Sequence, residues 1–96
     1  MSALQEIRNR FAPVLADLTN DVDASLSMIR SSQDPKFGDF QANCAMPLAK
    51  KSGVAPRDLA QQMVDQVQLD DFCETVEVAG PGFINLKLRT DWLEQQ

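Results

Sequence analysis

The chain has 96 residues, of which 44 % are hydrophobic and 24 % are charged, and its formal net charge is −5. This composition is typical of one globular domain rather than a disordered segment, and no apolar run approaches the roughly 20 residues of a membrane-spanning helix. The acidic balance excludes attraction to nucleic acid through the overall field of the protein, so any contact with RNA must depend on a local patch.

Residues 2–19 are predicted to form a helix, because their apolar side chains recur at spacings of three and four. These side chains are Leu4, Ile7, Phe11, Leu15 and Leu18. Pro13 falls inside the segment and is expected to kink or divide the helix. The first residues lack the apolar region and the small-residue cleavage site of a secretory signal, which predicts a cytoplasmic protein.

Residues 21–28 alternate between apolar and polar side chains. Val22, Ala24, Leu26 and Met28 take every second position, and aspartates and serines fill the others. This period of two predicts a half-buried strand. The next segment, 30–39, is rich in Ser, Asp, Pro and Gly and is predicted to be a loop.

A second helix is predicted within residues 40–53. Two lysines near its end and Gly53 directly after them are C-terminal signals. Pro47 leaves two alternatives open. Either the helix starts near Cys44, so that the proline lies in the first turn, or the helix is kinked.

Residues 55–71 predict a third helix. Pro56 suits the first helical position, and Asp58 suits the first turn, where a carboxylate interacts favourably with the helix dipole. The expected apolar stripe consists of Leu59, Met63, Val64 and Val67.

The last segments predict a β-hairpin, with strands at 74–78 and 83–88 and a turn at 79–82. Alternation directs one set of side chains inward: Val76, Val78, Ile84, Leu86 and Leu88. The outward set is Thr75, Glu77, Phe83, Asn85, Lys87 and Arg89. Thr90 is expected to cap a further helix. The order of elements predicts an α+β fold, in which helices pack on one face of a small antiparallel sheet of about four strands.

Catalytic chemistry finds little support in the residues. The chain contains no histidine, which is the commonest general base, and no phosphate-binding glycine-rich motif. Cys44 and Cys73 are isolated and are interpreted as reduced, buried thiols rather than as metal ligands or a disulfide. The acidic residues Asp70, Asp71 and Glu74 are interpreted as a solvated loop. The chain alone is therefore not expected to be an enzyme.

The outward side chains of the last strand suit contact with an unpaired nucleotide. The ring of Phe83 can stack on a base, and the amide of Asn85 can both donate to and accept from a base edge. Lys87 and Arg89 can meet phosphates. Two alternatives remain open: Phe83 packs under a loop on an ordinary polar strand face, or the chain is a non-catalytic protein-interaction module.

Two sequence blocks resemble a known family. The blocks are "FGDFQAN" at 37–43 and "VAGPGFIN" at 78–85. In this order and at this separation, they resemble the N-terminal additional domain of bacterial-type arginyl-tRNA synthetase over nearly the whole chain. The resemblance implies an α+β domain over 1–89 that recognises the D-loop of tRNA. It also implies that 90–96 begin a linker helix to a catalytic domain absent from this chain.

The same resemblance implies roles for individual residues. Phe83 and Asn85 would approach a D-loop base, Gly82 would let the backbone approach RNA, and Gln41 could reach it. Structural roles are expected in the first block for Phe37, Gly38 (backbone freedom), Asp39 and Asn43 (capping) and Phe40 (core). The implied partners are tRNA(Arg) and the remaining domains of the same polypeptide, with no DNA or membrane partner. ATP and Mg²⁺ would serve the full ligase, and no cofactor is expected in this chain.

Overall fold

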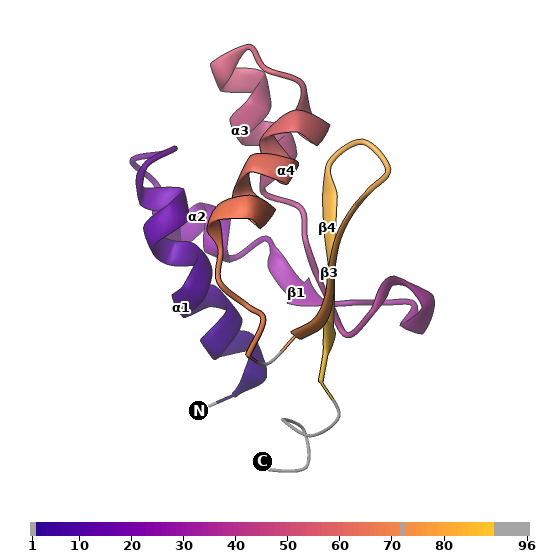
Figure 1. Ribbon diagram of the computed structural model, residues 1–96. Coiled ribbons are helices and arrows are strands. Elements are labelled where there is room, and N and C mark those ends of the chain that lie inside the picture. The colour runs from indigo at the N-terminus through magenta and orange to yellow at the C-terminus, as the bar shows by residue number, and fades with distance from the viewer. Residues whose placement is uncertain (1, 72, 90–96) are drawn as a thin grey trace.

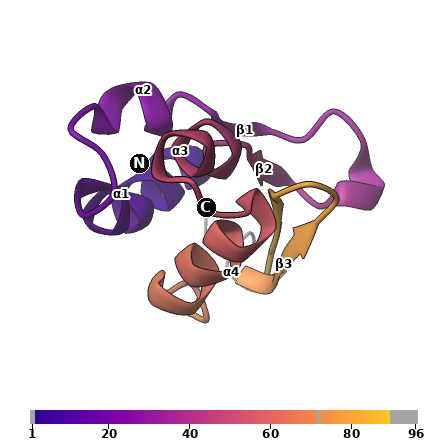
Figure 2. The ribbon, with the colours of Figure 1, turned by 90° about the horizontal axis from the view of Figure 1, so that it is seen from above.

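Four antiparallel strands form one sheet in the order β1-β2-β4-β3. The strands are β1 (Ile29–Ser31), β2 (Phe40–Ala42), β3 (Cys73–Ala79) and β4 (Phe83–Leu88). The structure is a computed structural model that describes residues 2–71 and 73–89. Figures 1 and 2 show the helices on one side of the sheet, while the short 3₁₀ helix η1 (Pro35–Phe37) projects on the other side. The predicted α+β class is confirmed.

Helix α1 (Ala3–Ala16) begins where the sequence predicts. The hydroxyl of Ser2 accepts a hydrogen bond from the Gln5 amide at 3.1 Å and so caps the first turn. Its buried face carries Ile7, Phe11, Val14 and Leu15. Pro13 lies inside the helix without dividing it into two elements.

The strand predicted at 21–28 is wrong, because this segment forms helix α2 (Val22–Leu26). The carboxylate of Asp21 accepts a hydrogen bond from the Ala24 amide at 3.2 Å and starts the helix. Val22 and Leu26, one turn apart, both pack against the core. A local cap therefore overrides the alternating pattern, and the strand begins only at Ile29, so that two residues predicted as loop belong to β1.

The helix predicted from residue 40 starts later, because Phe40–Ala42 form β2. Helix α3 spans Ala45–Ser52 with Cys44 at its N-cap and Gly53 in the left-handed conformation at its end. Pro47 therefore lies in the first turn, which was one of the two expected alternatives. Helix α4 (Pro56–Gln66) is shorter than predicted, because the backbone leaves the helical conformation at Val67, which is extended.

The predicted hairpin is confirmed, with Val76 opposite Leu86 and Val78 opposite Ile84. Ile84 and Leu86 are fully buried under the helices, as alternation predicted. The expected cap at Thr90 and the segment 90–96 lie outside the described residues. Within the described ranges, no helix is long and apolar enough to cross a membrane.

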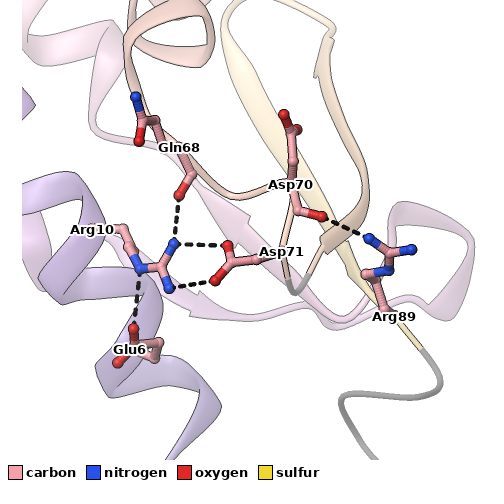
Figure 3. Close-up of polar contacts among 6 residues, drawn as sticks. All are labelled: Glu6, Arg10, Gln68, Asp70, Asp71 and Arg89. Atoms are coloured by element: carbon pink, nitrogen blue, oxygen red, sulfur yellow. Dashed lines mark hydrogen bonds and ion pairs between the residues drawn. The ribbon is translucent and has the colours of Figure 1, made fainter.

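A polar cluster ties α1 to the segment that precedes β3 (Figure 3). The Arg10 guanidinium makes a bidentate ion pair with Asp71, at 2.7 and 2.8 Å. It also donates to Glu6 at 3.0 Å and to the Gln68 carbonyl at 2.7 Å. The hydrogen bond from Arg10 holds the pKa of the Asp71 carboxyl below its ordinary value. Part of the acidic run predicted as a solvated loop is therefore a structural ion pair.

This ion pair makes stability depend on pH. Since the pKa of Asp71 is lower in the folded chain, the pair stabilises the fold above the unfolded pKa of about 3.9. That stabilisation is lost as the pH falls through the folded pKa. We expect Asp71→Asn to lower the free energy of unfolding at pH 7 by about 0.2–1 kcal/mol, the range of exposed ion pairs.

Urea denaturation at pH 7 and near pH 2 measures this effect. The difference between the wild type and Asp71→Asn should shrink toward the lower pH, because protonation of Asp71 removes the charge that the asparagine variant lacks. Glu74→Gln is the control, since Glu74 lies 3.6 Å from Lys87 in a pair whose side chains are more than half exposed. An equal loss in both variants would contradict a specific role for Asp71.

Candidate functional site

The face of the sheet opposite the helices carries a row of polar side chains, one from each strand. Strand register pairs Arg30 with Gln41, Gln41 with Asn85, and Asn85 with Glu77. Their neighbours along β4, Ile84 and Leu86, are buried on the helix side, so the row lies on the outer side. We call this side the open face.

Two amides meet at the centre of the open face. Nε2 of Gln41 donates to Oδ1 of Asn85 at 2.8 Å, although the two residues are 44 positions apart. Both side chains are half-buried. The bond leaves the Asn85 NH₂ group and the Gln41 oxygen for a ligand, and flipping both amides would exchange donor and acceptor. The pair can therefore offer either arrangement of donor and acceptor to a base edge.

Phe83 lies at the start of β4, opposite Ala79 on β3. Its ring is half-buried beside the hairpin turn, because a Cβ on Gly80 would lie 3.3 Å from the ring. Gly82 has a φ of 135°, and a Cβ there would lie 3.0 Å from Pro56 on α4. Gly82 is buried, so its missing side chain serves close packing of the turn against α4.

The two predicted cations occupy different surroundings. Lys87 is exposed on the open face, with its ammonium 3.6 Å from Glu74. Nη1 of Arg89 donates to the Asp70 carbonyl at 2.8 Å, beside the Arg10 cluster (Figure 3). Lys87 therefore belongs to the same surface as Asn85, whereas Arg89 helps to fasten the end of β4.

The first sequence block is attached directly to β4. A Cβ on Gly38 (φ 94°) would lie 2.6 Å from the Leu86 carbonyl oxygen, so only glycine fits. The Asp39 amide donates to that same carbonyl at 2.8 Å, and the Asp39 carboxylate accepts from the Leu88 amide at 2.8 Å. Asp39 thus caps strand hydrogen-bonding groups rather than a helix.

The remaining residues of this block take different positions. Phe40 packs partly buried against the core, as expected. Cys44 rather than Asn43 occupies the N-cap of α3. The backbone N–H of Asn43 donates to the Met28 carbonyl at 3.1 Å. The side-chain Oδ1 of Asn43 is buried without a hydrogen-bond partner among the described residues.

Phe37 is the residue of the open face whose exposure the sequence interpretation missed. It is 41 % exposed, and the Lys36 ammonium lies 5.4 Å from its ring centroid. The ring borders two hollows. One, of about 320 Å³, we call the β1–β2 hollow, and it is lined by Arg30, Ser31, Gln33, Asp34, Phe37, Gln41 and Asn43. The other, of about 270 Å³, we call the β3–β4 hollow, and it is lined by Lys36, Phe37, Gly38, Thr75, Glu77, Asn85 and Lys87.

A sequence signal for Phe37 exists. It is an aromatic residue within a segment rich in Ser, Asp, Pro and Gly. Such segments usually lie at the surface, so a large ring there is a candidate for a surface role.

The cysteines lie away from the open face. Cys44 and Cys73 are buried and free. Burial raises the pKa of the Cys44 thiol to about 11 and that of Cys73 to about 12. Both thiols are therefore protonated near pH 7 and are poor nucleophiles. Over residues 2–71 and 73–89, no cluster of three His, Cys, Asp or Glu side chains could hold a metal ion.

Sequence comparison identifies relatives for nearly the whole chain. The family model "Arginyl tRNA synthetase N terminal domain" matches residues 5–88. An arginine–tRNA ligase from Synechocystis sp. is 43 % identical over 97 residues, which cover 100 % of this chain and 17 % of the relative. One from Rhodopirellula baltica is 48 % identical over 83 residues, which cover 86 % of this chain and 12 % of the relative. The chain thus spans less than a fifth of the length of these relatives.

Solved structures share the fold. Arginyl-tRNA synthetase from Thermus thermophilus superposes with a TM-score of 0.74 at 23 % identity, covering 98 % of this chain and 15 % of the other. The enzyme from Plasmodium falciparum superposes with a TM-score of 0.77 at 21 % identity, covering 96 % of this chain and 17 % of the other. The sheet and its helices are therefore an arrangement that experimental structures contain.

Proposed function

Because the chain belongs to the family of arginyl-tRNA synthetase N-terminal domains, we propose that it contacts the D-loop at the outer corner of tRNA(Arg) and so supports arginylation. The observation that carries this proposal is the Gln41–Asn85 amide pair on the open face. Its two members come from the two sequence blocks that characterise the chain. If these two side chains had pointed to the helix side of the sheet, their amides would be enclosed in the core and could not meet a base.

In this proposal, a D-loop base leaves its stack and lies against the ring of Phe83. Stacking of a base on an aromatic ring contributes about 1–3 kcal/mol. The Asn85 NH₂ group and the Gln41 oxygen, left free by their mutual bond, hydrogen-bond the base edge. Lys87 lies two residues further along β4 and meets a phosphate. Arg89 contributes mainly through the fold, since it is bonded to Asp70.

The chemistry of arginylation belongs, in this proposal, to other parts of a longer polypeptide. ATP and Mg²⁺ would be bound there, in the cytoplasm, and this domain would act by holding the tRNA in register. Its effect on the reaction is therefore one of positioning, visible in kcat/KM for tRNA.

Substitutions on the open face test the proposal. In the full-length ligase that carries this domain, we expect Phe83→Leu and Asn85→Asp each to lower kcat/KM for tRNA(Arg) by about 5- to 150-fold, or 1–3 kcal/mol. Phe83→Leu keeps the apolar bulk and removes the flat ring. Asn85→Asp keeps the acceptor for Gln41 and removes the NH₂ donor.

The matched control is Val54→Ala, which truncates an exposed apolar side chain between α3 and α4. It should leave kcat/KM unchanged. Wild-type kinetics in both Phe83→Leu and Asn85→Asp, with unchanged thermal unfolding, would reject the D-loop contact.

A protein-interaction role is the second candidate, favoured by one observation. A hollow of about 430 Å³ lies between α4 and the edge strand β3, and half-buried Val64, Val76 and Val78 line it beside Arg57 and Gln61. Such a hollow suits contact with another domain of the same polypeptide. Amide NMR shifts of the 96-residue chain on addition of tRNA(Arg) distinguish the two, since RNA contact should move Gln41 and Asn85 rather than these valines.

A further inference from the structure

Phe37 is exposed but held in place. Its ring borders both hollows of the open face, and it is one of two exposed large apolar side chains among the described residues. The next two residues fasten the loop, since Gly38 packs on the Leu86 carbonyl and Asp39 bonds to Leu86 and Leu88. A ring fixed in this way meets a ligand with little loss of conformational entropy.

The β1–β2 hollow offers polar groups that no neighbour satisfies. Nε of Arg30 donates to the Ser27 carbonyl at 3.0 Å, and its two terminal nitrogens have no partner within the described part of the chain. Oδ1 of Asn43 is likewise without a partner there. The Gln41 oxygen, which the Gln41–Asn85 bond does not use, also borders this hollow and has two lone pairs, so it can accept from the second base in addition to the first. Donors and acceptors around an aromatic ring match the edge and face of a nucleobase.

Phe37 and Phe83 are separate platforms. Phe83 lines neither hollow, and the anchor of the Phe37 loop at Leu86 lies three residues, about 10 Å, along β4 from Phe83. One base cannot stack on both rings. The Gln41–Asn85 pair lies between the two positions and contributes one residue to each hollow.

We propose that Phe37 stacks a second unpaired tRNA nucleotide, whose base enters the β1–β2 hollow while its neighbour occupies the Phe83–Asn85 position. The inference rests on the proposed D-loop contact and extends it from one nucleotide to two. Asp34 also lines this hollow, so binding there depends on stacking and on Arg30 and amide contacts rather than on a uniformly positive surface. Arg30 is placed to meet the phosphate or the base edge.

Double-mutant cycles in the full-length ligase test the inference. Phe37→Leu and Phe83→Leu are each combined with tRNA(Arg) transcripts that lack one D-loop base at a time. We expect Phe37→Leu to lower kcat/KM at least about five-fold and to have no further effect when one particular base is missing. Phe83→Leu should couple in the same way to a different base. Phe37→Trp, which keeps a flat ring, should retain activity, and Val54→Ala is again the control.

The outcomes separate the two proposals. If Phe83→Leu couples to a base and Phe37→Leu couples to none, the second nucleotide is wrong and the D-loop contact stands. If both couple to the same base, the inference of two separate positions is overturned. If neither couples to any D-loop base, both proposals fail.

Discussion

Gly38→Ala should lower the free energy of unfolding by about 2–5 kcal/mol. The φ of 94° costs a residue with a side chain about 1–2 kcal/mol, and the new methyl would lie 2.6 Å from the Leu86 carbonyl oxygen, a clash that costs about 1–3 kcal/mol. The neighbour is backbone in a central strand, so it cannot rotate away. Equilibrium urea unfolding followed by circular dichroism measures the loss.

Gly53→Ala is the matched control for this prediction. Gly53 also has a positive φ, of 73°, but a Cβ there would meet nothing within 4 Å. We expect only the conformational cost of about 1–2 kcal/mol. Equal losses in both variants would show that the contact with Leu86 contributes nothing.

Leu86→Ala should cost about 2–5 kcal/mol, because the side chain is fully buried under the helices and its removal leaves a cavity. The neighbouring substitution Lys87→Ala should change stability by no more than about 0.5 kcal/mol, since Lys87 is exposed. The comparison tests the orientation of β4, on which the open face depends. The same unfolding experiment measures both variants. A larger loss for Lys87→Ala than for Leu86→Ala would show that the buried and exposed faces of β4 are assigned the wrong way round.

Long periodic segments were predictable from the sequence. Helix α1, helix α4 and the β3–β4 hairpin each contain enough repeats of one period to place their buried faces. The orientation of Phe83, Asn85 and Lys87 followed from the hairpin alone, because the buried face of β4 fixes its register.

Short segments were not predictable by the same reasoning. Helix α2 has five residues and strand β2 has three, each shorter than two helical turns. At this length a cap or a strand partner decides the outcome. Strand β2 has three residues and gains its hydrogen bonds from β1 and β4, which the local sequence does not encode.

The candidate site was predictable only in part for the same reason. Gln41 was a candidate because of the family resemblance, but its bond to Asn85 depends on the adjacency of β2 and β4. The role of Phe37 depends on a loop whose position is set by contacts with Leu86 and Leu88. Pairing across 44 residues is a tertiary property.

The attachment of Gly38 and Asp39 to β4 holds the loop that carries Phe37 and the strand that carries Phe83 together as one unit. Whatever tilts or shifts that strand must carry both aromatic rings with it, so their mutual spacing is preserved while their orientation toward the rest of a larger assembly changes. An insertion between this attachment and either ring would change the distance between the two rings. Added length in the loop from α3 to α4 would leave that distance unchanged.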